Sequence, residues 1–406
     1  MQKSGKILVV TQHYPPDPTT TAVYVGAISQ ALALDSRVLV LSGSPRSGSQ
    51  GGERAANPAV IEIPTWTAPK NALLRRAIAI SLLALRMFLA TWRRVGRRDV
   101  VFCVTTPFTL PYAAVLAARL RGAATVLLIY DLYPEALEAA GLIGPSSLPA
   151  RLLRLANARM YRALSAIVTI GRDVAPLLLA YKGVTTEKIR FIPNWSLLPA
   201  GYRDISPDNR YRPGRQGQLV VGLSGNLGFT HGPRTVFEAA RLLKANSDVH
   251  FLLSGWGIGW QELGDLQAAE QLDNVSLLAP VPQTDLVAFL SSADVWIIPY
   301  RRNIRGVSIP SRLYNLLAIG RAIIVAADPQ SEAALVVEEE QIGWVVQAED
   351  ARQLADAICS AASDRAGTQQ KGRRAAAAAE KYDQGSALAR YRQVILDAAN
   401  SHRPSE

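Results

Sequence analysis

Short runs of apolar, mostly β-branched residues recur along this chain and alternate with longer stretches of helical periodicity. The runs are apolar on both faces and helical stretches separate them, which is the pattern of parallel strands covered by helices on both sides. Two such series of about six strands each predict an α/β protein with two doubly wound, Rossmann-like domains. The runs cover residues 6–12, 37–43, 99–106, 124–131, 166–171 and 189–194 in the first series, and 218–226, 249–255, 275–280, 293–300, 322–327 and 342–347 in the second.

A stretch rich in proline, glycine and charged residues lies between the two series, at residues 196–216. This composition is typical of a linker, although an ordinary long loop would look the same. We therefore predict one domain over residues 1–203 and a second over residues 204–380. Residues 381–406 have the pattern of one or two further helices.

The composition is that of a folded protein, because 49% of the 406 residues are hydrophobic and only 19% are charged. The two cysteines, Cys103 and Cys359, lie far apart and form no Cys-x-x-Cys pair. We therefore expect neither a disulfide framework nor a zinc site, and a reducing cytoplasm fits the sequence. The first residues lead directly into a strand, so we expect no signal peptide.

The excess positive charge is confined to the first half of the chain. Of the formal net charge of +11, residues 1–203 carry +14 and residues 204–406 carry −3. The first domain is therefore expected to face an anionic partner.

One segment of the second half, residues 294–326, has the pattern of a phosphate site. A buried strand is followed by a loop with three arginines, a short helix opening at residues 310–312, a stop at Gly320 and another strand. Ser311 enters this helix between Arg305 and Arg312, where free N–H groups and the positive helix end attract anions. Parallel α/β sheets bind ligands at such strand ends.

A second anion-receptive loop opens the same domain, at residues 224–232. Strand, glycine-rich turn and helix follow one another there, and Gly225, Asn226 and Gly228 would line the turn. A plain strand-to-helix turn is the alternative. The loop matches neither a dinucleotide fingerprint nor a P-loop, which disfavours a dehydrogenase or an NTPase. Two such loops in one domain suit a nucleotide diphosphate.

With these motifs in place, the chain resembles the family 4 glycosyltransferases of GT-B fold, and within them the WbuB-like transferases of bacterial O-antigen and exopolysaccharide assembly. The resemblance spans nearly the whole chain. Its motifs are HYPPDP at residues 13–18 and the segments 131–141, 192–195, 224–232, 293–300 and 310–325.

The resemblance implies two Rossmann-like domains that face each other across a cleft. The second domain would bind a nucleotide sugar, expected to be UDP-linked, and the first a lipid-linked saccharide such as an undecaprenyl diphosphate sugar at the cytoplasmic face of the membrane. Transfer would retain the anomeric configuration, and the last helix would cross back to the first domain.

The sequence departs from the family in three places. Many relatives carry a Glu-x7-Glu motif where this chain has Val307 and Asn315, although Asn315 could still bind a ribose hydroxyl. The Arg and Lys that follow the glycine loop in many relatives are missing, so that phosphate would be neutralised by Arg312 and Arg305. Threonines at residues 19–21 replace a glycine-rich turn.

Three further residues are candidates for contact with the substrates. Asp131 ends a strongly apolar strand and could handle the acceptor hydroxyl, or it could cap the following turn. His13 at the end of the first strand could contact phosphate or acceptor, or it could be structural. His231 lies in the glycine-rich loop and could contact the sugar nucleotide.

No Asp-x-Asp and no cluster of His or Cys occurs in the sequence. A metal-dependent transferase is therefore disfavoured, and helix ends and arginines would stabilise the leaving diphosphate. We expect no cofactor beyond the donor substrate.

The region 70–98 holds eight cations and no acidic residue before Asp99. Its apolar part is too short to span a bilayer, and a basic helix with Leu, Phe and Trp fits an anionic membrane surface. A buried helix with solvated arginines is the alternative, and no nucleic-acid-binding module is present. The cations assigned to membrane or acceptor contact are Arg75, Arg76, Arg86, Arg93 and Arg94, and a second basic set at helical spacing comprises Arg151, Arg154, Arg159 and Arg162.

The sequence thus predicts a peripheral, cytoplasmic glycosyltransferase. Two rivals stay open at this point. One is a UDP-GlcNAc 2-epimerase of the same fold, which would need no membrane, and the other is a non-catalytic subunit that binds a nucleotide sugar.

Overall fold

The computed structural model describes residues 5–45, 55–66, 73–212, 214–215, 217–308 and 311–401. Lys70 of the basic region and Pro310 of the phosphate-site motif lie outside this range. The chain forms two compact units, each considered by itself below. The first comprises Met1–Pro134, Gly144–Pro193 and Gly385–Glu406, and the second comprises Glu135–Ile143 and Asn194–Gln384. The change of unit thus falls at Pro193, ten residues before residue 203.

The first unit contains a seven-stranded parallel sheet in the order β3-β2-β1-β4-β5-β6-β7. Its central strands are fully buried because apolar residues occupy both of their faces. The strands are β1 (Ile7–Thr11), β2 (Val38–Gly43), β3 (Ala59–Ile63), β4 (Val100–Val104), β5 (Ala124–Ile129), β6 (Ala166–Thr169) and β7 (Ile189–Phe191).

The strand β3 is absent from the sequence-based prediction. It pairs in parallel with β2 at the edge of the sheet, and only Ile63 among its residues is buried. An edge strand that is half exposed and carries Glu62 lacks the continuous apolar pattern by which the other strands were identified.

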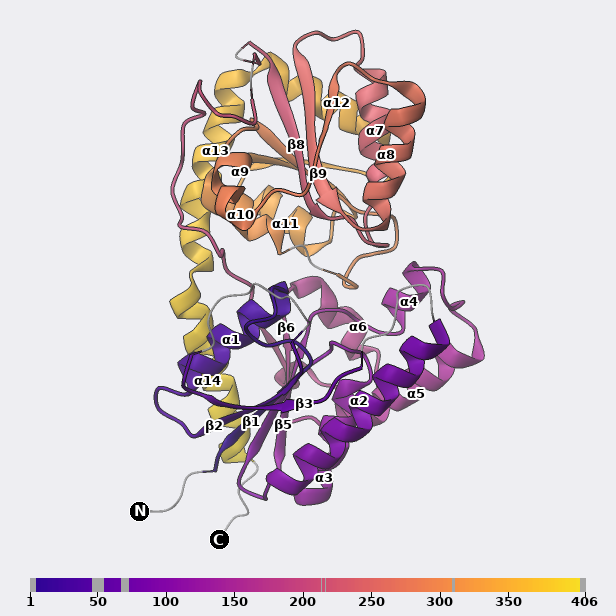
Figure 1. Ribbon diagram of the computed structural model, residues 1–406, viewed down its shortest axis with the longest axis vertical. Helices are drawn as coiled ribbons and strands as arrows, with labels where there is room; N and C mark the ends of the chain where they lie inside the picture. The colour runs from indigo at the N-terminus through magenta and orange to yellow at the C-terminus, as the bar shows by residue number, and fades with distance from the viewer. Residues whose placement is uncertain are drawn as a thin grey trace. The chain divides into compact units, whose positions relative to one another are not determined.

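Helices cover both faces of this sheet (Figure 1). The right-handed crossovers place α1 (Thr20–Leu32) on one face, and α2 (Leu73–Arg94), α3 (Leu110–Arg121) and α5 (Leu148–Ala163) side by side on the other. The last helix, α14 (Gln384–Ser401), also belongs to this unit: Tyr391 packs edge-on against Phe102 with ring centroids 6.2 Å apart. A short α6 (Ala175–Leu179) connects β6 with β7.

The second unit contains a six-stranded parallel sheet in the order β10-β9-β8-β11-β12-β13. This is a doubly wound sheet, because the chain starts in the middle at β8, winds outwards to β10 and then returns to β11. The strands are β8 (Leu219–Asn226), β9 (Val249–Trp256), β10 (Val275–Leu278), β11 (Val295–Pro299), β12 (Ala322–Ala326) and β13 (Gly343–Val346).

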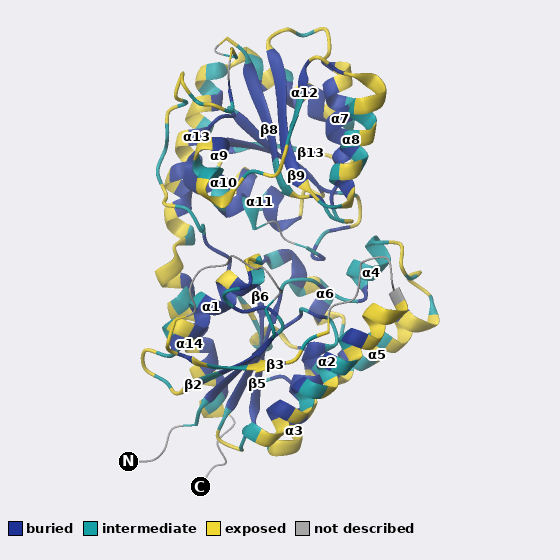
Figure 2. Cartoon of the chain, viewed as in Figure 1, coloured by how far each residue is buried: buried dark blue, intermediate teal, exposed yellow. Residues whose placement is uncertain are grey.

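Each face of the second sheet carries its own hydrophobic core, visible as the dark strands and inner helix faces in Figure 2. Alternate residues of one strand serve the two cores: Val295 and Ile297 of β11 join one, Trp296 and Ile298 the other. The first core is covered by α7 (Pro233–Leu242), α8 (Ile258–Glu270) and α12 (Ala351–Ser363), and the second by α4 (Glu135–Ala139), α9 (Leu286–Leu290), α10 (Arg312–Ile319), α11 (Glu332–Glu339) and α13 (Arg365–Ala379).

The proline-rich stretch before β8 packs onto the second unit. Tyr211 lies edge-on against Phe289 with ring centroids 5.2 Å apart. Arg212 donates to the carboxylate of Asp294 at 2.8 Å and to the carbonyl of Gln218 at 2.7 Å. The segment expected to be a linker is therefore largely an ordered arm of this unit.

Candidate functional site

The glycine-rich loop and the arginine-bearing helix meet at the carboxyl edge of the second sheet. Both follow neighbouring parallel strands, β8 and β11, whose ends lie at one edge. Gly225 has φ +99°, which disfavours any residue with a side chain. A Cβ atom at Gly225 would also lie 3.5 Å from Cζ of Arg312. The positive φ is therefore what favours glycine here, while an added methyl would be in ordinary van der Waals contact with Arg312.

The guanidinium of Arg312 is the centre of this site. Its Nη2 atom donates to the carbonyl oxygen of Asn226 and lies 3.2 Å from Nε2 of His231. Its Nη1 atom is buried and has no hydrogen-bond partner in the described part of the chain. Burial lowers the pKa of Arg312 to about 10, so the group remains charged at neutral pH. A partly buried guanidinium with one unpaired donor is suited to binding an anion.

His231 supports Arg312. It is buried, its ring stacks on Tyr300 with centroids 5.4 Å apart, and its Nδ1 lies 3.2 Å from Oγ1 of Thr230. Burial, and then the charges of Arg312 and Arg301, hold the pKa of His231 well below 6.5. The imidazole is therefore neutral at pH 7, and its Nε2 can accept a hydrogen bond from the guanidinium of Arg312.

Gly228 and Ser311 complete the two loops. The carbonyl oxygen of Gly228 accepts from the backbone N–H of His231 at 3.1 Å, which closes the turn after β8. Ser311 immediately precedes α10, and its side chain makes no capping hydrogen bond to the helix. The first amides of α10 therefore have no acceptor from this serine.

Asn315, at the position of a family glutamate, holds the arm in place. Its Oδ1 accepts from the backbone N–H of Leu197 at 3.0 Å and from the hydroxyl of Ser196 at 3.3 Å. Its Nδ2 group has no hydrogen-bond partner among the residues described. One end of the side chain is thus structural, and the other is available as a donor.

Arg305 and Val307 do not touch Arg312 through any hydrogen bond or ion pair of the described residues. Arg305 donates to the side-chain oxygen of Gln330 ahead of α11, and Val307 is buried in a hydrophobic core. Arg305 lies in the same loop as Arg301, which donates to the carbonyl oxygen of His231 at 3.0 Å.

Three exposed apolar side chains at this edge were not identified from the sequence. Phe229 is 45% exposed, Trp256 53% and Ile258 52%. Trp256 ends β9 and is paired in register with Asn226, and Phe229 lies in the glycine-rich loop itself. The signal in the sequence is an aromatic residue directly at the end of a strand, where a ligand would be bound.

The first unit brings its own candidate residues to the carboxyl edge of its sheet. Past the end of β1, Nδ1 of His13 lies 2.5 Å from Oδ2 of Asp17, and both residues are buried. Past the end of β5, the backbone N–H groups of Tyr130 and Asp131 donate to the hydroxyl of Thr105 at 3.1 and 3.3 Å.

The carboxylate of Asp131 accepts no hydrogen bond from the described residues, so it is not a helix cap. Burial raises its pKa to about 6. Because β4 separates β5 from β1, Asp131 lies two strands from His13, a lateral spacing of about 10 Å.

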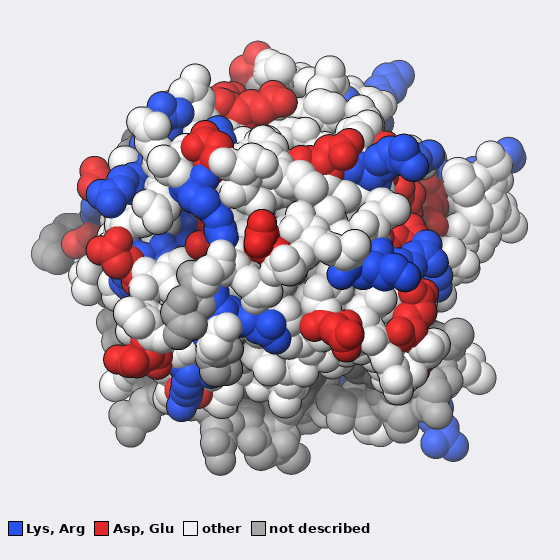
Figure 3. All heavy atoms as spheres, turned by 90° about the horizontal axis from the view of Figure 1, so that it is seen from above, with Lys and Arg blue, Asp and Glu red and all other residues white. Residues whose placement is uncertain are grey.

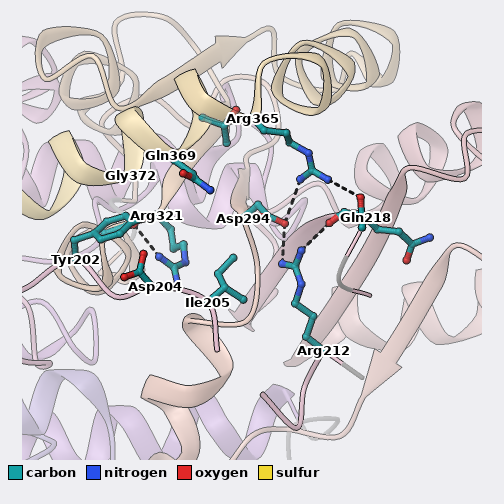
Figure 4. A pocket seen from close by; sticks show the side chains of 13 residues that line it. Tyr202, Asp204, Ile205, Arg212, Gln218, Asp294, Arg321, Arg365, Gln369 and Gly372 are labelled. Carbon is teal, nitrogen blue, oxygen red and sulfur yellow. Dashed lines mark hydrogen bonds and ion pairs between the residues drawn. The ribbon is translucent and has the colours of Figure 1, made fainter. Parts of the chain in front are cut away.

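A cavity of about 430 Å³ lies at the opposite, amino edge of the second sheet (Figure 4). Arg212 and Arg365 converge there on the carboxylate of Asp294, at 2.8 and 3.6 Å. The same carboxylate accepts from the backbone N–H of Val220. These paired groups tie the arm and α13 to the sheet, and they lie far from the loops around Arg312.

Among the residues described, no group of three or more His, Cys, Asp or Glu is placed to hold a metal ion. In the same part of the chain, no helix is long and apolar enough to span a membrane.

Two family models account for most of the chain. "Glycosyl transferase 4-like domain" matches residues 19–195, and "Glycosyl transferases group 1" matches residues 218–364. The chain belongs to the family 4 glycosyltransferases. Accordingly, it is a transferase, and its closely packed loops at Gly225 and Arg312 lie in the group 1 domain.

Two relatives agree with this assignment. The probable glycosyltransferase WbjE of Pseudomonas aeruginosa is 28% identical over 71% of this chain and 73% of its own length. The putative colanic acid biosynthesis glycosyl transferase WcaI of Escherichia coli K12 is 27% identical over 82% of this chain and 86% of its own length.

Solved structures share the fold across the whole chain. HepE of Anabaena, crystallised with UDP, matches 98% of this chain and 100% of its own with a TM-score of 0.68 and 16% identity. WaaG, a glycosyltransferase of lipopolysaccharide biosynthesis, matches 96% and 99% with a TM-score of 0.62 and 15% identity. The predicted GT-B fold of this family 4 glycosyltransferase is confirmed.

Proposed function

We propose that this family 4 glycosyltransferase moves a sugar from a UDP-sugar to a lipid-linked saccharide, with retention of anomeric configuration, in the assembly of a cell-surface polysaccharide. The observation that carries the donor half is the guanidinium of Arg312, whose buried Nη1 atom has no hydrogen-bond partner among the described residues and which lies beside the left-handed Gly225. This group is suited to a diphosphate, which carries acceptor oxygens and negative charge.

The comparisons favour UDP and a polysaccharide. HepE, of similar fold, was crystallised with UDP and with UDP-glucose, and WcaI is named for colanic acid biosynthesis. Phe229 and Trp256 offer exposed aromatic surface for a uracil or sugar ring beside the glycine loop.

The proposed chemistry places developing charge on the leaving diphosphate. Arg312, held by Asn226 and His231, would stabilise this charge as the bond from the sugar to the diphosphate breaks. The acceptor hydroxyl attacks on the same face, and a diphosphate oxygen takes its proton. Asp131 and His13 would orient the acceptor, while Asn315 donates through Nδ2 to the nucleoside. Arg305 would add positive charge to the same loop.

The direct test is transfer. The protein, reconstituted with membranes, is incubated with a panel of UDP-sugars and polyprenyl diphosphate sugars, and the masses of the lipids are read. A gain of one sugar is expected. Interconversion of free UDP-sugars without transfer would identify an epimerase, and UDP binding without either reaction would identify a non-catalytic subunit.

We further propose that the first unit docks on an anionic membrane through the outer surface of α2, α3 and α5, called here the docking face. The three helices together contain eleven arginines and no aspartate or glutamate. On the face of the molecule in Figure 3, by contrast, acidic and basic side chains are interspersed. Charge of a single sign on three adjacent helices is complementary to anionic lipid.

The docking face also exposes large apolar side chains, between 37% and 75% of each (Figure 2). Their spacing in α2 and α5 places them on one side of each helix. They are Leu74, Ile78, Leu85, Leu89 and Trp92 in α2, Leu116 and Leu120 in α3, and Leu148, Leu152 and Leu155 in α5. Leucine and tryptophan among arginines are typical of surfaces that lie in the headgroup region of a bilayer.

A further inference from the structure

A hollow of about 230 Å³ lies between the carboxyl ends of α3 and α5 in the first unit. Three arginines line it, Arg119 from α3 and Arg159 and Arg162 from α5. Its other lining residues are Gly122, Ala123, Thr125 and Ala163, so that no carboxylate contributes to its wall.

The cations around this hollow have no acidic partner. In the described residues, Arg119, Arg159 and Arg162 form no ion pair; Nη1 of Arg159 donates to a carbonyl of its own helix at 3.4 Å. A fourth cation adds to the crowding, because Lys188 donates to the carbonyl oxygen of Arg162 at 2.8 Å. Burial, and then the charge of Arg162, lower the pKa of Lys188. Like charges brought together repel, and an anion between them would relieve the repulsion.

Cations near helix carboxyl ends are common, because they interact with the helix dipole. That effect explains why Arg162 lies in the last turn of α5 and Arg119 in the last turn of α3. It does not explain why arginines of two different helices line one hollow. Several arginines around one hollow are suited to binding phosphate.

The hollow belongs to the docking face. Leu155, Arg159 and Arg162 follow one another at positions i, i+4 and i+7 of α5 and therefore share one side of that helix. On α3, Arg119 lies one turn (i+3) after Leu116, which is 52% exposed. With these leucines at the boundary of the acyl chains, the hollow lies at the depth of lipid phosphates.

The hollow is remote from the candidate acceptor residues. Thr125 lies near the start of β5 and Asp131 follows its end, six residues further, which is about 20 Å of extended chain. A ligand here would therefore not be the reacting part of the acceptor.

We propose that this hollow binds the phosphate of an anionic membrane lipid, with preference for an exposed phosphomonoester, and so fixes the first unit on the bilayer. The proposal rests on the docking face of the proposed function. A phosphomonoester offers three terminal oxygens and up to two charges to the three guanidinium groups, whereas a diester buried between two alcohols offers fewer.

The test compares vesicles of phosphatidylcholine containing either phosphatidate or phosphatidylglycerol, matched in surface potential. The pocket variant is Arg119→Gln/Arg159→Gln/Arg162→Gln, and the control is Arg75→Gln/Arg76→Gln/Arg93→Gln, which removes three exposed charges from α2. Both variants should bind on the order of 100-fold more weakly overall, because each loses three cations near the surface. The preference for phosphatidate should be several-fold in the wild type and the control and should vanish in the pocket variant. An equal preference in all three proteins, or none in the wild type, overturns the proposal.

A second measurement separates the pocket from the docking face. Monomeric dihexanoyl phosphatidate and inorganic phosphate are titrated into each protein in solution by calorimetry. Binding of the short-chain lipid to the wild type and not to the pocket variant supports the pocket even if no vesicle is bound, in which case the docking face alone is wrong. Equal affinity for inorganic phosphate shows a free-phosphate site and overturns the lipid assignment, as does the absence of any binding.

Discussion

The Nη2 atom of Arg312 lies 3.2 Å from Nε2 of His231, and the pKa of this histidine is held well below 6.5. The guanidinium therefore donates a hydrogen bond to a neutral imidazole, and the two side chains do not repel each other as two cations would. Since Nη2 is committed to His231 and Asn226, the buried Nη1 is left for a ligand. The histidine thus fixes which side of the guanidinium would meet the diphosphate of the proposed donor.

Replacing Arg312 with Ala should lower the rate of sugar transfer by about 10² to 10³, the usual loss when one donor to a developing anion is removed. UDP binding should weaken as well. The control is Arg302→Ala on the neighbouring loop, because Arg302 faces Glu349 at 3.6 Å and the carbonyl of Ala348. Kinetics with a radiolabelled donor, inhibited by UDP, measure the transfer rate and the affinity for UDP in each variant. Wild-type turnover in the Arg312 variant would remove this residue from the mechanism.

Replacing Asp131 with Asn should lower turnover by less than about tenfold, because in the proposed mechanism a diphosphate oxygen and not this carboxylate takes the proton. A general base would be worth about 10² to 10⁴. The wild-type rate should fall as pH drops through about 6, where Asp131 takes up its proton. This acid limb should be absent from the Asn variant. A loss of 10² or more at pH 8 would instead make Asp131 the base.

Substituting Gly225 with Ala should impair donor binding more than folding. The left-handed backbone at this position costs about 1–2 kcal/mol for a residue with a side chain, and the new methyl would contact the guanidinium of Arg312. Gly264 provides the matched control, because it lies in α8 and nothing is found within 4 Å of a Cβ built there. Calorimetry with UDP and thermal unfolding report the two effects. Equal UDP affinity in both variants would contradict the close approach.

Charges placed on the docking face should detach the protein from anionic vesicles. Leu85→Glu and Trp92→Glu each remove apolar area that burial would stabilise by about 1.5–3 kcal/mol, so at least tenfold weaker binding is expected. Leu34→Glu is the control, because Leu34 is 82% exposed and follows α1 on the other face of the sheet. Sedimentation with phosphatidylglycerol vesicles gives the affinities. If all three variants bind equally, α2 does not contact lipid.

The sequence predicted both sheets well because their inner strands are apolar on two faces. It missed β3, an exposed edge strand, and assigned to a linker an arm that Arg212 and Tyr211 fasten to the second unit. It also identified both loops around Arg312. The contact between Arg312 and His231 could not be predicted from the sequence, because the two residues are 81 positions apart and only the folded sheet brings them together. Phe229 and Trp256 were not predicted as site residues, because the sequence alone does not show whether an aromatic side chain is exposed or buried.

Asn315 has a mechanical consequence. The chain leaves the first unit at Pro193, and a few residues later Leu197 is bonded to Asn315, one turn along the helix that begins with Arg312. The segment that follows Pro193 is thus hydrogen-bonded to α10, the helix that would bind the donor. A displacement of the backbone at Leu197 would therefore act directly on α10 through this hydrogen bond, without passing through the hydrophobic core. Asn315, at the position where many relatives have a glutamate, is the residue that makes this connection.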